Sequence, residues 1–156
     1  MRFGALEAGG TKMVCAVGDE SGKILNRVSI PTETPEITMP KLLDYFQDSG
    51  IKALGIGCFG PVDLDPASET YGYITTTSKL AWINYDICGS FRKRLQVPIG
   101  FDTDVNGSML GEAAWGCARG LDTAIYVTVG TGVGEGELAG GKLQHGMQHP
   151  ERGHIL

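Results

Sequence analysis

The chain has 156 residues, a length typical of one domain, and its 42% hydrophobic and 20% charged residues are the proportions of an ordinary globular protein. The formal net charge is -5 and Arg92–Arg94 is the only basic cluster, so nucleic-acid binding is disfavoured. No signal peptide opens the chain and no apolar run approaches the length of a membrane span. We therefore expect a cytoplasmic protein without a membrane partner, with its four cysteines reduced because they lack CxxC spacing.

The first half of the chain predicts an antiparallel meander followed by a helix and a strand. Short β-rich segments separated by tight turns predict strands at Arg2–Leu6, Met13–Val17 and Ile24–Ile30. Apolar residues at helical spacing predict a helix at Glu36–Gln47. A buried strand is expected at Ile51–Cys58, and residues 59–82 are expected to form a long, threonine-rich loop.

The second half predicts two more helices around one strand, and then a hairpin. The expected elements are a helix at Gly89–Gln96, a strand at Pro98–Phe101, a helix from Asp104 to Cys117, and hairpin strands at Ala124–Val129 and Gly136–Ala139. The residues expected on the buried side of the third helix are Val105, Met109, Ala113 and Trp115.

This order of elements predicts an α/β fold, a mixed sheet with helices on both faces. The hairpin that begins at Ala124 has the pattern of a second, similar unit. We therefore expect a small domain at residues 1–118 and the incomplete start of a larger domain at residues 119–156, as part of a longer protein.

Two glycine-rich turns, each carrying a threonine, enclose an isolated acidic motif. The turns are Glu7–Lys12 (EAGGTK) and Thr128–Gly134 (TVGTGVG), and the motif between them is Asp102–Asn106 (DTDVN). Backbone N–H groups in a tight glycine turn, together with a threonine hydroxyl, can hold phosphate oxygens. Two such turns and a carboxylate are the parts of a phosphoryl-transfer site, in which the acid activates the acceptor hydroxyl.

Two other glycine patterns do not fit the sites that they imitate. Gly55–Gly60 matches G-x-G-x-x-G, but the residues after it have no helical pattern, which a dinucleotide site requires. Gly136–Lys142 nearly matches a P-loop, but Leu143 stands where a serine or threonine would hold Mg²⁺.

The two turns, the DVN motif at Asp104–Asn106 and the ERGH motif at Glu151–His154 together resemble the ordered motif set of the ROK sugar kinases over residues 3–155. The resemblance implies a ribonuclease-H-like fold of the actin/hexokinase/Hsp70 ATPase type. It also implies ATP-dependent phosphorylation of a hexose, with Mg²⁺, and a homodimer when the protein is complete.

The opening Glu7–Lys12 segment is similar to that of the fructokinase branch, because glucokinases usually carry an aspartate and a larger aliphatic residue at positions 7 and 8. The resemblance therefore favours fructose as substrate and fructose 6-phosphate as product. A glucokinase or mannokinase of the same family is the alternative.

The family mechanism implies that Asp104 is the general base for the primary hydroxyl of the sugar. Two alternatives stay open: Asp104 is the capping residue of the following helix, or Asp102 is the reacting carboxylate. The resemblance assigns the ATP phosphates to Gly9, Gly10, Thr11, Lys12, Thr131 and Gly132. Glu7 is a candidate for binding Mg²⁺ through water.

The implied sugar contacts are Thr103, Asn106, Glu151 and His154. Thr103 replaces an asparagine that many family members carry, and a hydroxyl reaches less far than an amide. His154 also begins a family zinc site whose remaining ligands would lie beyond Leu156. His145 and His149 are expected to be loop residues, because Gly146 and Pro150 argue against a helix presenting both.

Three competing functions are distinguished by the same motifs. A repressor of this family would need a DNA-binding segment ahead of the first glycine turn, which begins within ten residues of Met1. An actin-like or chaperone ATPase would lack the ERGH sugar motif. The third alternative is a non-catalytic fragment that binds nucleotide or sugar, because the adenine pocket should come from a later part of the protein.

Overall fold

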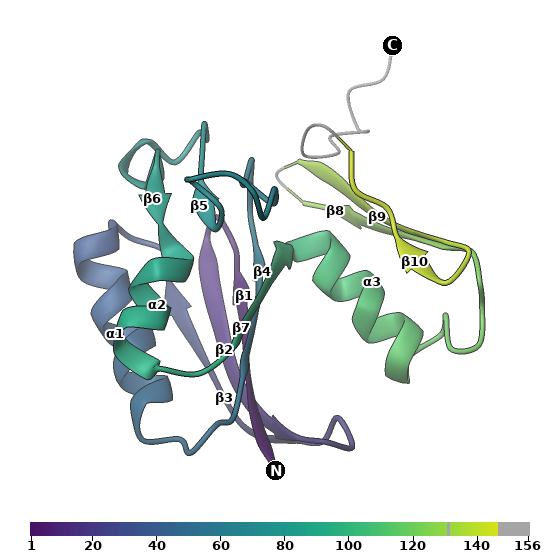
Figure 1. Cartoon of the computed structure of the whole chain (residues 1–156), viewed down its shortest axis with the longest axis horizontal. Coiled ribbons are helices and arrows are strands. Elements are labelled where there is room, and N and C mark those ends of the chain that lie inside the picture. The colour runs from purple at the N-terminus through teal and green to yellow at the C-terminus, as the bar shows by residue number, and fades with distance from the viewer. Residues whose placement is uncertain (131, 147–156) are drawn as a thin grey trace.

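A five-stranded mixed sheet forms the centre of the computed structural model, which describes residues 1–130 and 132–146 (Figure 1). In the order β3-β2-β1-β4-β7, its strands are β3 (Ile24–Pro31), β2 (Lys12–Asp19), β1 (Arg2–Ala8), β4 (Leu54–Cys58) and β7 (Ile99–Thr103). The first three strands of the chain are antiparallel, whereas β4 and β7 continue the sheet in parallel to β1. The predicted meander and mixed sheet are therefore confirmed.

Two helices, α1 (Pro35–Gln47) and α2 (Ile87–Leu95), cover one face of this sheet (Figure 1). Both correspond to predicted helices. Their contact includes Phe46 and Phe91, whose rings meet edge to face with centroids 6.1 Å apart. Both phenylalanines are almost fully buried, so this side of the sheet holds a closed hydrophobic core.

The long predicted loop between β4 and α2 is held to the body of the protein by Trp82. The indole is buried, and its Nε1 donates a hydrogen bond to the Glu33 carbonyl at 2.8 Å. The segment also contains short regular elements that were not predicted, which are β5 (Tyr73–Ile74), a 3-10 turn (Leu80–Trp82) and β6 (Tyr85–Asp86).

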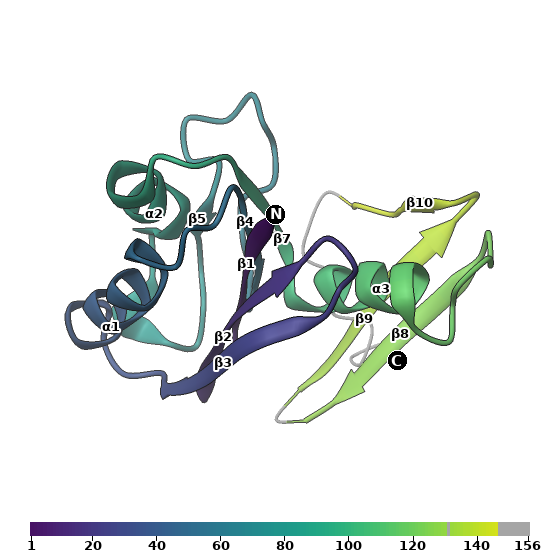
Figure 2. The same cartoon turned by 90° about the horizontal axis from the view of Figure 1, so that it is seen from below.

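The third helix, α3 (Asp104–Trp115), lies on the opposite face of the sheet (Figure 2). A glycine on β4 permits this close approach, because a Cβ on Gly57 would lie only 3.2 Å from the Asp104 Cα. A Cβ on Gly107 of α3 would be in ordinary contact, 3.6 Å from the Gly57 Cα. Helices therefore lie on both faces of the sheet, as predicted.

A second, three-stranded sheet packs against the other side of α3. Its strands, in the order β10-β9-β8, are β10 (Lys142–Leu143), β9 (Val133–Ala139) and β8 (Ala124–Val129). A Cβ on Gly136 would lie 2.5 Å from the Val105 carbonyl oxygen, so only glycine permits this contact. The predicted hairpin is confirmed, and β9 begins three residues earlier than predicted.

One residue of α3 departs from the predicted burial. Val105 and Met109 are buried as predicted, but Trp115 is 65% exposed. The end of α3 reaches the β2–β3 turn, where the indole ring lies so close to Gly22 that a Cβ there would be 2.7 Å from it. Trp115 therefore covers a surface turn rather than entering a core.

The outer face of β8 carries an exposed apolar row. Ile125, Val127 and Val129 are 58%, 54% and 79% exposed. The division into domains at residues 118 and 119 stays a prediction. Across residues 1–130 and 132–146, no helix is both long and apolar enough to span a bilayer.

Candidate active site

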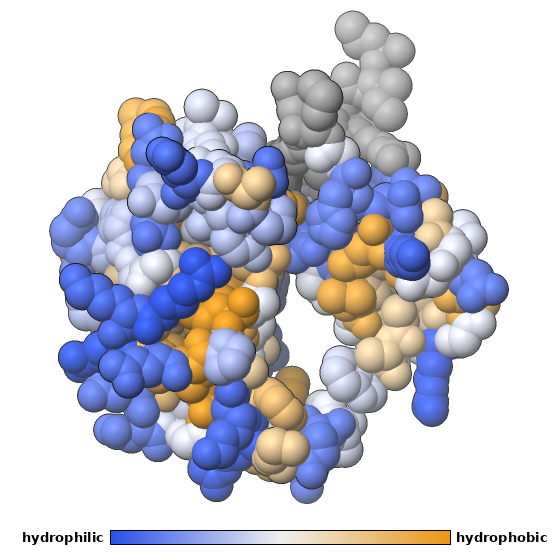
Figure 3. All heavy atoms as spheres, in the orientation of Figure 1, coloured by the Kyte–Doolittle hydropathy of each residue, from blue (hydrophilic) through white to orange (hydrophobic). Residues whose placement is uncertain are grey.

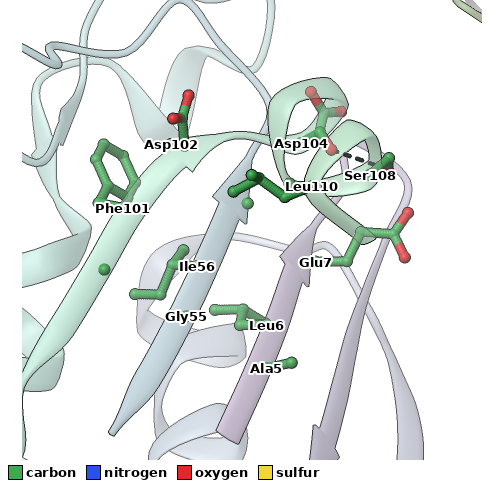
Figure 4. Close-up of a pocket in the computed structure, with 13 residues that line it drawn as sticks. Ala5, Leu6, Glu7, Gly55, Ile56, Phe101, Asp102, Asp104, Ser108 and Leu110 are labelled. Carbon is green, nitrogen blue, oxygen red and sulfur yellow. Dashed lines mark hydrogen bonds between the residues drawn. The ribbon is translucent and has the colours of Figure 1, made fainter. Parts of the chain in front are cut away.

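Three carboxylates gather where the carboxyl ends of the central strands meet the start of α3 (Figure 4). Glu7 of β1 and Asp102 of β7 lie in one row of the sheet, each paired with Gly57 of β4. Asp104 begins α3 immediately after β7. In open α/β sheets, ligands bind outside the carboxyl ends of the strands, so this edge is the expected place for a site.

A cavity of about 580 Å³ separates the open sheet face from α3 and is lined by all three carboxylates. Figure 3 shows an opening between the body that contains the five-stranded sheet and the body that contains α3. Small residues at one level of the sheet, Ala5, Gly55 and Gly100, form part of the wall. The site is therefore accessible and has room for a small molecule.

The first glycine turn connects β1 and β2 at the same end of the sheet. Gly9 N donates to the Lys12 carbonyl at 3.1 Å, and a Cβ on Gly9 would lie 2.5 Å from that oxygen, so a side chain would not fit. Thr11 and Lys12 are exposed. The side chain of Lys79 also approaches this turn, with Cε 3.5 Å from the position of a Cβ on Gly10. Two lysines thus lie at the predicted phosphate-binding turn.

The second glycine turn joins β8 and β9. Gly130 N donates to the Gly132 carbonyl at 2.9 Å, and both glycines are exposed, with no atoms crowding a Cβ at either position. Thr131, a predicted phosphate ligand, lies outside the described residues.

Asp104 occupies the first turn of α3 but does not cap it. The capping residue is Thr103, whose hydroxyl accepts a hydrogen bond from Asn106 N at 3.1 Å. The alternative that Asp104 is the capping residue is therefore wrong. One carboxylate oxygen of Asp104 accepts from Val105 N at 2.9 Å. The positive end of the α3 dipole favours a negative charge at this position.

Asp104 also lies near the buried thiol of Cys58 at the end of β4. Burial, and then the negative charge of Asp104, raise the pKa of Cys58 well above its ordinary value. Cys58 therefore stays neutral beside the acidic site.

Asp102 is held by donors from three places. Its Oδ1 accepts from Thr103 N and from Asn106 Nδ2, both at 2.8 Å, and its Oδ2 lies 2.8 Å from His145 Nε2. The prediction that His145 lies in a loop is confirmed, but the sequence contained no sign of this contact. The two residues are 43 positions apart and no motif connects them.

Two of the predicted sugar contacts are turned away from solvent. Both Thr103 and Asn106 are 1% exposed, and both are engaged in the start of α3 as described above. The threonine caps the helix and the asparagine amide bonds to Asp102, so both side chains shape the start of α3, and their contact with sugar stays a prediction. Glu151 and His154 lie outside the described residues.

The metal predictions have no cluster to support them in the part of the chain that the structure describes. There, no group of three or more His, Cys, Asp or Glu side chains is arranged to hold a metal ion. Glu7 is exposed at the end of β1 and lines the cavity, so its carboxylate can face a bound ion. His154, the predicted zinc ligand, is not among the described residues.

Comparison with known proteins agrees with this arrangement. The chain is 49% identical over 153 residues to a putative fructokinase of Bacillus subtilis (strain 168), covering 98% of this chain and 51% of that protein. It is 44% identical over 155 residues to a fructokinase of Pediococcus pentosaceus, covering 99% and 54%. The chain thus spans about half the length of the curated relatives it matches.

A solved structure gives the same fold. The ROK family glucokinase of Streptomyces griseus, in complex with glucose and AMPPNP, superposes with a TM-score of 0.84 at 28% identity, covering 99% of this chain and 50% of that one. The predicted actin/hexokinase-like, ribonuclease-H-type fold is therefore confirmed. The profile of the ROK family matches residues 3–156. This chain belongs to the ROK family.

Proposed function

We propose that this chain is the amino-terminal part of an ATP-dependent hexose kinase that converts fructose to fructose 6-phosphate. The observation that carries the proposal is the position of Asp104, a carboxylate in the first turn of α3 that lines an open cavity beside a glycine turn. The identity of 44–49% to proteins named fructokinase or putative fructokinase supports the same function.

In the proposed reaction, Asp104 accepts the proton of the primary hydroxyl as that oxygen attacks the γ-phosphorus of ATP. The bond between the γ-phosphorus and the bridging oxygen breaks, and ADP leaves with the electron pair. Such a base contributes about 10²–10⁴-fold, and positioning supplies much of the rest. Asp102 is a weaker candidate for the base, because three donors already occupy its oxygens.

The turn around Gly9 and Gly10 suits the phosphates of ATP. A Cβ on Gly9 would fill the space within the turn, and Thr11 and Lys12 are exposed beside it. We add Lys79 to this set, because its side chain lies over Gly10. The second turn would contribute Thr131 and Gly132. Mg²⁺, when bound, would neutralise phosphate charge, and Glu7 would hold it through water.

The hexose would lie in front of Asp104, with Glu151 and His154 donating or accepting hydrogen bonds to its hydroxyls. We assign Thr103 and Asn106 an indirect role, since their side chains hold the start of α3. The zinc site that begins at His154 stays a prediction, which metal analysis of the complete protein would test.

The substrate is tested by a coupled ADP-release assay on the complete protein with Mg-ATP and fructose, mannose and glucose in parallel. We expect fructose to give the largest kcat/KM. Turnover with glucose alone would assign the protein to the glucokinase branch instead. Release of ADP that is independent of every sugar would contradict the kinase function.

We also propose that residues 1–118 form a complete small domain and that residues 119–156 begin a second domain. The exposed apolar row on β8 supports this division, because such a surface is normally covered. Residues 1–156 alone should therefore release no ADP above background with Mg-ATP and fructose. The complete kinase is proposed to be a cytoplasmic homodimer, and light scattering would measure its mass.

A further inference from the structure

We propose that His145 is a positioning residue of this site: its hydrogen bond to Asp102 fixes the start of α3, which carries Asp104. The inference rests on the proposed kinase function and adds a residue to it. The contact that carries the inference is the one with Asp102, so His145 would act on the reaction through that carboxylate.

The bond joins two sheets between which residues 1–130 and 132–146 form no strand pairing. Asp102 ends β7 of the five-stranded sheet, whereas His145 follows β10 of the three-stranded sheet. The Nε2 and Oδ2 atoms are 2.8 Å apart, and the side chains are 45% and 19% exposed. Since an ionised carboxylate only accepts, the proton lies on Nε2, and both neutral and charged imidazole can supply it.

Asp102 transmits this contact to the helix. Its other oxygen, Oδ1, accepts from the side-chain amide of Asn106 at 2.8 Å. Asp102 stands two residues before Asp104 in the sequence, and Asn106 stands two residues after it. The bond between them therefore closes a short loop of backbone that contains Asp104. A rotation of the Asp102 carboxylate would therefore disturb the backbone that places the proposed base.

Asn106 has little freedom to compensate for such a change. It is 1% exposed, and its Oδ1 is buried without a hydrogen-bond partner among the described residues. The orientation of its amide consequently depends on the bond from Nδ2 to Asp102. Loss of that bond would leave both polar atoms of a buried amide unsatisfied, which is strongly unfavourable.

The residue that this bond would position acts on the sugar and not on the nucleotide. Asp104, the proposed base, takes the proton of the sugar hydroxyl, whereas the glycine turn at Gly9 and Gly10 is the proposed site of the ATP phosphates. We accordingly expect the sugar parameters of the reaction to depend on His145 more than the ATP parameters do.

The test is steady-state kinetics of the complete protein with the variants His145→Ala, His145→Gln and Asp102→Ala, and the double variant His145→Ala/Asp102→Ala. We expect His145→Ala to lower kcat/KM for the sugar by about tenfold, because small displacements of a reacting group have large effects on rate. The KM for Mg-ATP should change less than twofold. A glutamine at this position places an amide donor near the former Nε2, so His145→Gln should restore most of the activity.

The double variant should be no worse than the poorer single variant, because both changes remove one interaction. Gln144→Ala is the matched control, because Gln144 is the neighbour of His145 and its side-chain amide donates to the carbonyls of Ala139 and Lys142. This variant should keep kcat/KM within twofold of the wild type. Nitrogen-15 NMR of the imidazole gives a readout besides activity, with a protonated Nε2 expected in the wild type and altered in Asp102→Ala.

Three results would overturn the positioning role: unchanged sugar kinetics in His145→Ala, failure of His145→Gln to recover activity, or effects of the single variants that multiply in the double variant. Each presupposes an active wild type. A wild type that phosphorylates no hexose would refute the proposed function itself, while the NMR signal would still report whether the bond exists.

Discussion

The two sheets of this protein differ in how completely they are covered. The five-stranded sheet has α1 and α2 packed over one face, where the core includes large side chains with almost no exposure, and α3 meets the end of β4 at Gly57 on the other face. The three-stranded sheet packs one face on α3 and leaves Ile125, Val127 and Val129 exposed on the other. The difference indicates that the first region supplies most of the stability, whereas the second presents an apolar face of the kind that interaction surfaces have.

The largest expected effect is in the core of the first region. Phe46 is 1% exposed between Tyr45 and Phe91, so Phe46→Ala should lower the free energy of unfolding by about 3–5 kcal/mol. Urea denaturation monitored by circular dichroism would measure the change. Ile37→Ala, at a residue 45% exposed on the same helix, is the control and should change stability by about 0.5 kcal/mol or less. Equal losses in both variants would contradict a core centred on Phe46.

The next effect concerns the contact between α3 and the second sheet. Gly136→Ala would place a methyl group 2.5 Å from the Val105 carbonyl, and the required shift should cost about 1–3 kcal/mol. Gly111→Ala is the matched change within α3, where nothing lies within 4 Å of the new Cβ, and it should stabilise the protein by about 0.4–1 kcal/mol. The same urea experiment compares them. A neutral Gly136→Ala would mean that the hairpin does not pack closely on α3.

A smaller effect tests whether the outer face of β8 is covered in the complete protein. Val127 is 54% exposed, so Val127→Thr in residues 1–156 should alter stability by about 0.5 kcal/mol or less. In the complete protein, the same substitution should cost about 1–3 kcal/mol if the hydroxyl is buried there without a partner. Thermal denaturation of both proteins would show the difference. Identical small changes would argue against the proposed second domain.

The smallest expected effect is a difference in alkylation rate between the buried cysteines of the first region and the exposed Cys117. Burial raises the pKa of Cys15 and of Cys88 to about 12, and Cys58 is also buried, so these thiols should resist alkylation in the native protein. Cys117, after α3, is exposed, but the neighbouring Glu112 raises its pKa. Iodoacetamide should therefore label only Cys117, faster as the pH rises toward the pKa of that thiol.

Glu112→Gln would remove the negative charge, lower the pKa of Cys117 and increase its labelling rate at a fixed, mildly alkaline pH. Mass spectrometry identifies the labelled cysteine and gives the rate. Labelling of Cys58 at a comparable rate would contradict the closed core beside Asp104.

Most of the fold could be predicted because local patterns and tertiary packing agree. The alternation in β1, the helical spacing in α1 and the turns between them all favour the same elements. Trp115 was placed wrongly because helical periodicity indicates a face but not where the packing partner ends. Trp115, the last residue of the helix, meets the turn at Gly22 instead.

The site was less predictable, because it depends on contacts between distant residues. The family resemblance indicated the two glycine turns and Asp104, because each of them lies in a short contiguous motif. Two contacts arise only from the tertiary structure, and no sequence motif predicts them. They are the contact of His145 with Asp102 and the approach of Lys79 to Gly10. The position of Thr103 and Asn106 in the motif also did not reveal that their side chains hold the start of α3.

The coupled ADP-release assay on the complete protein with fructose distinguishes the two candidate bases when Asp104→Asn is compared with Asp102→Asn. If Asp104 is the general base, Asp104→Asn should lower kcat by about 10²–10⁴-fold with little change in the KM for Mg-ATP. Asp102→Asn retains an accepting oxygen and should lose much less. An Asp104→Asn variant that keeps most of its kcat, or an Asp102→Asn variant that is the more damaged of the two, would contradict the assignment.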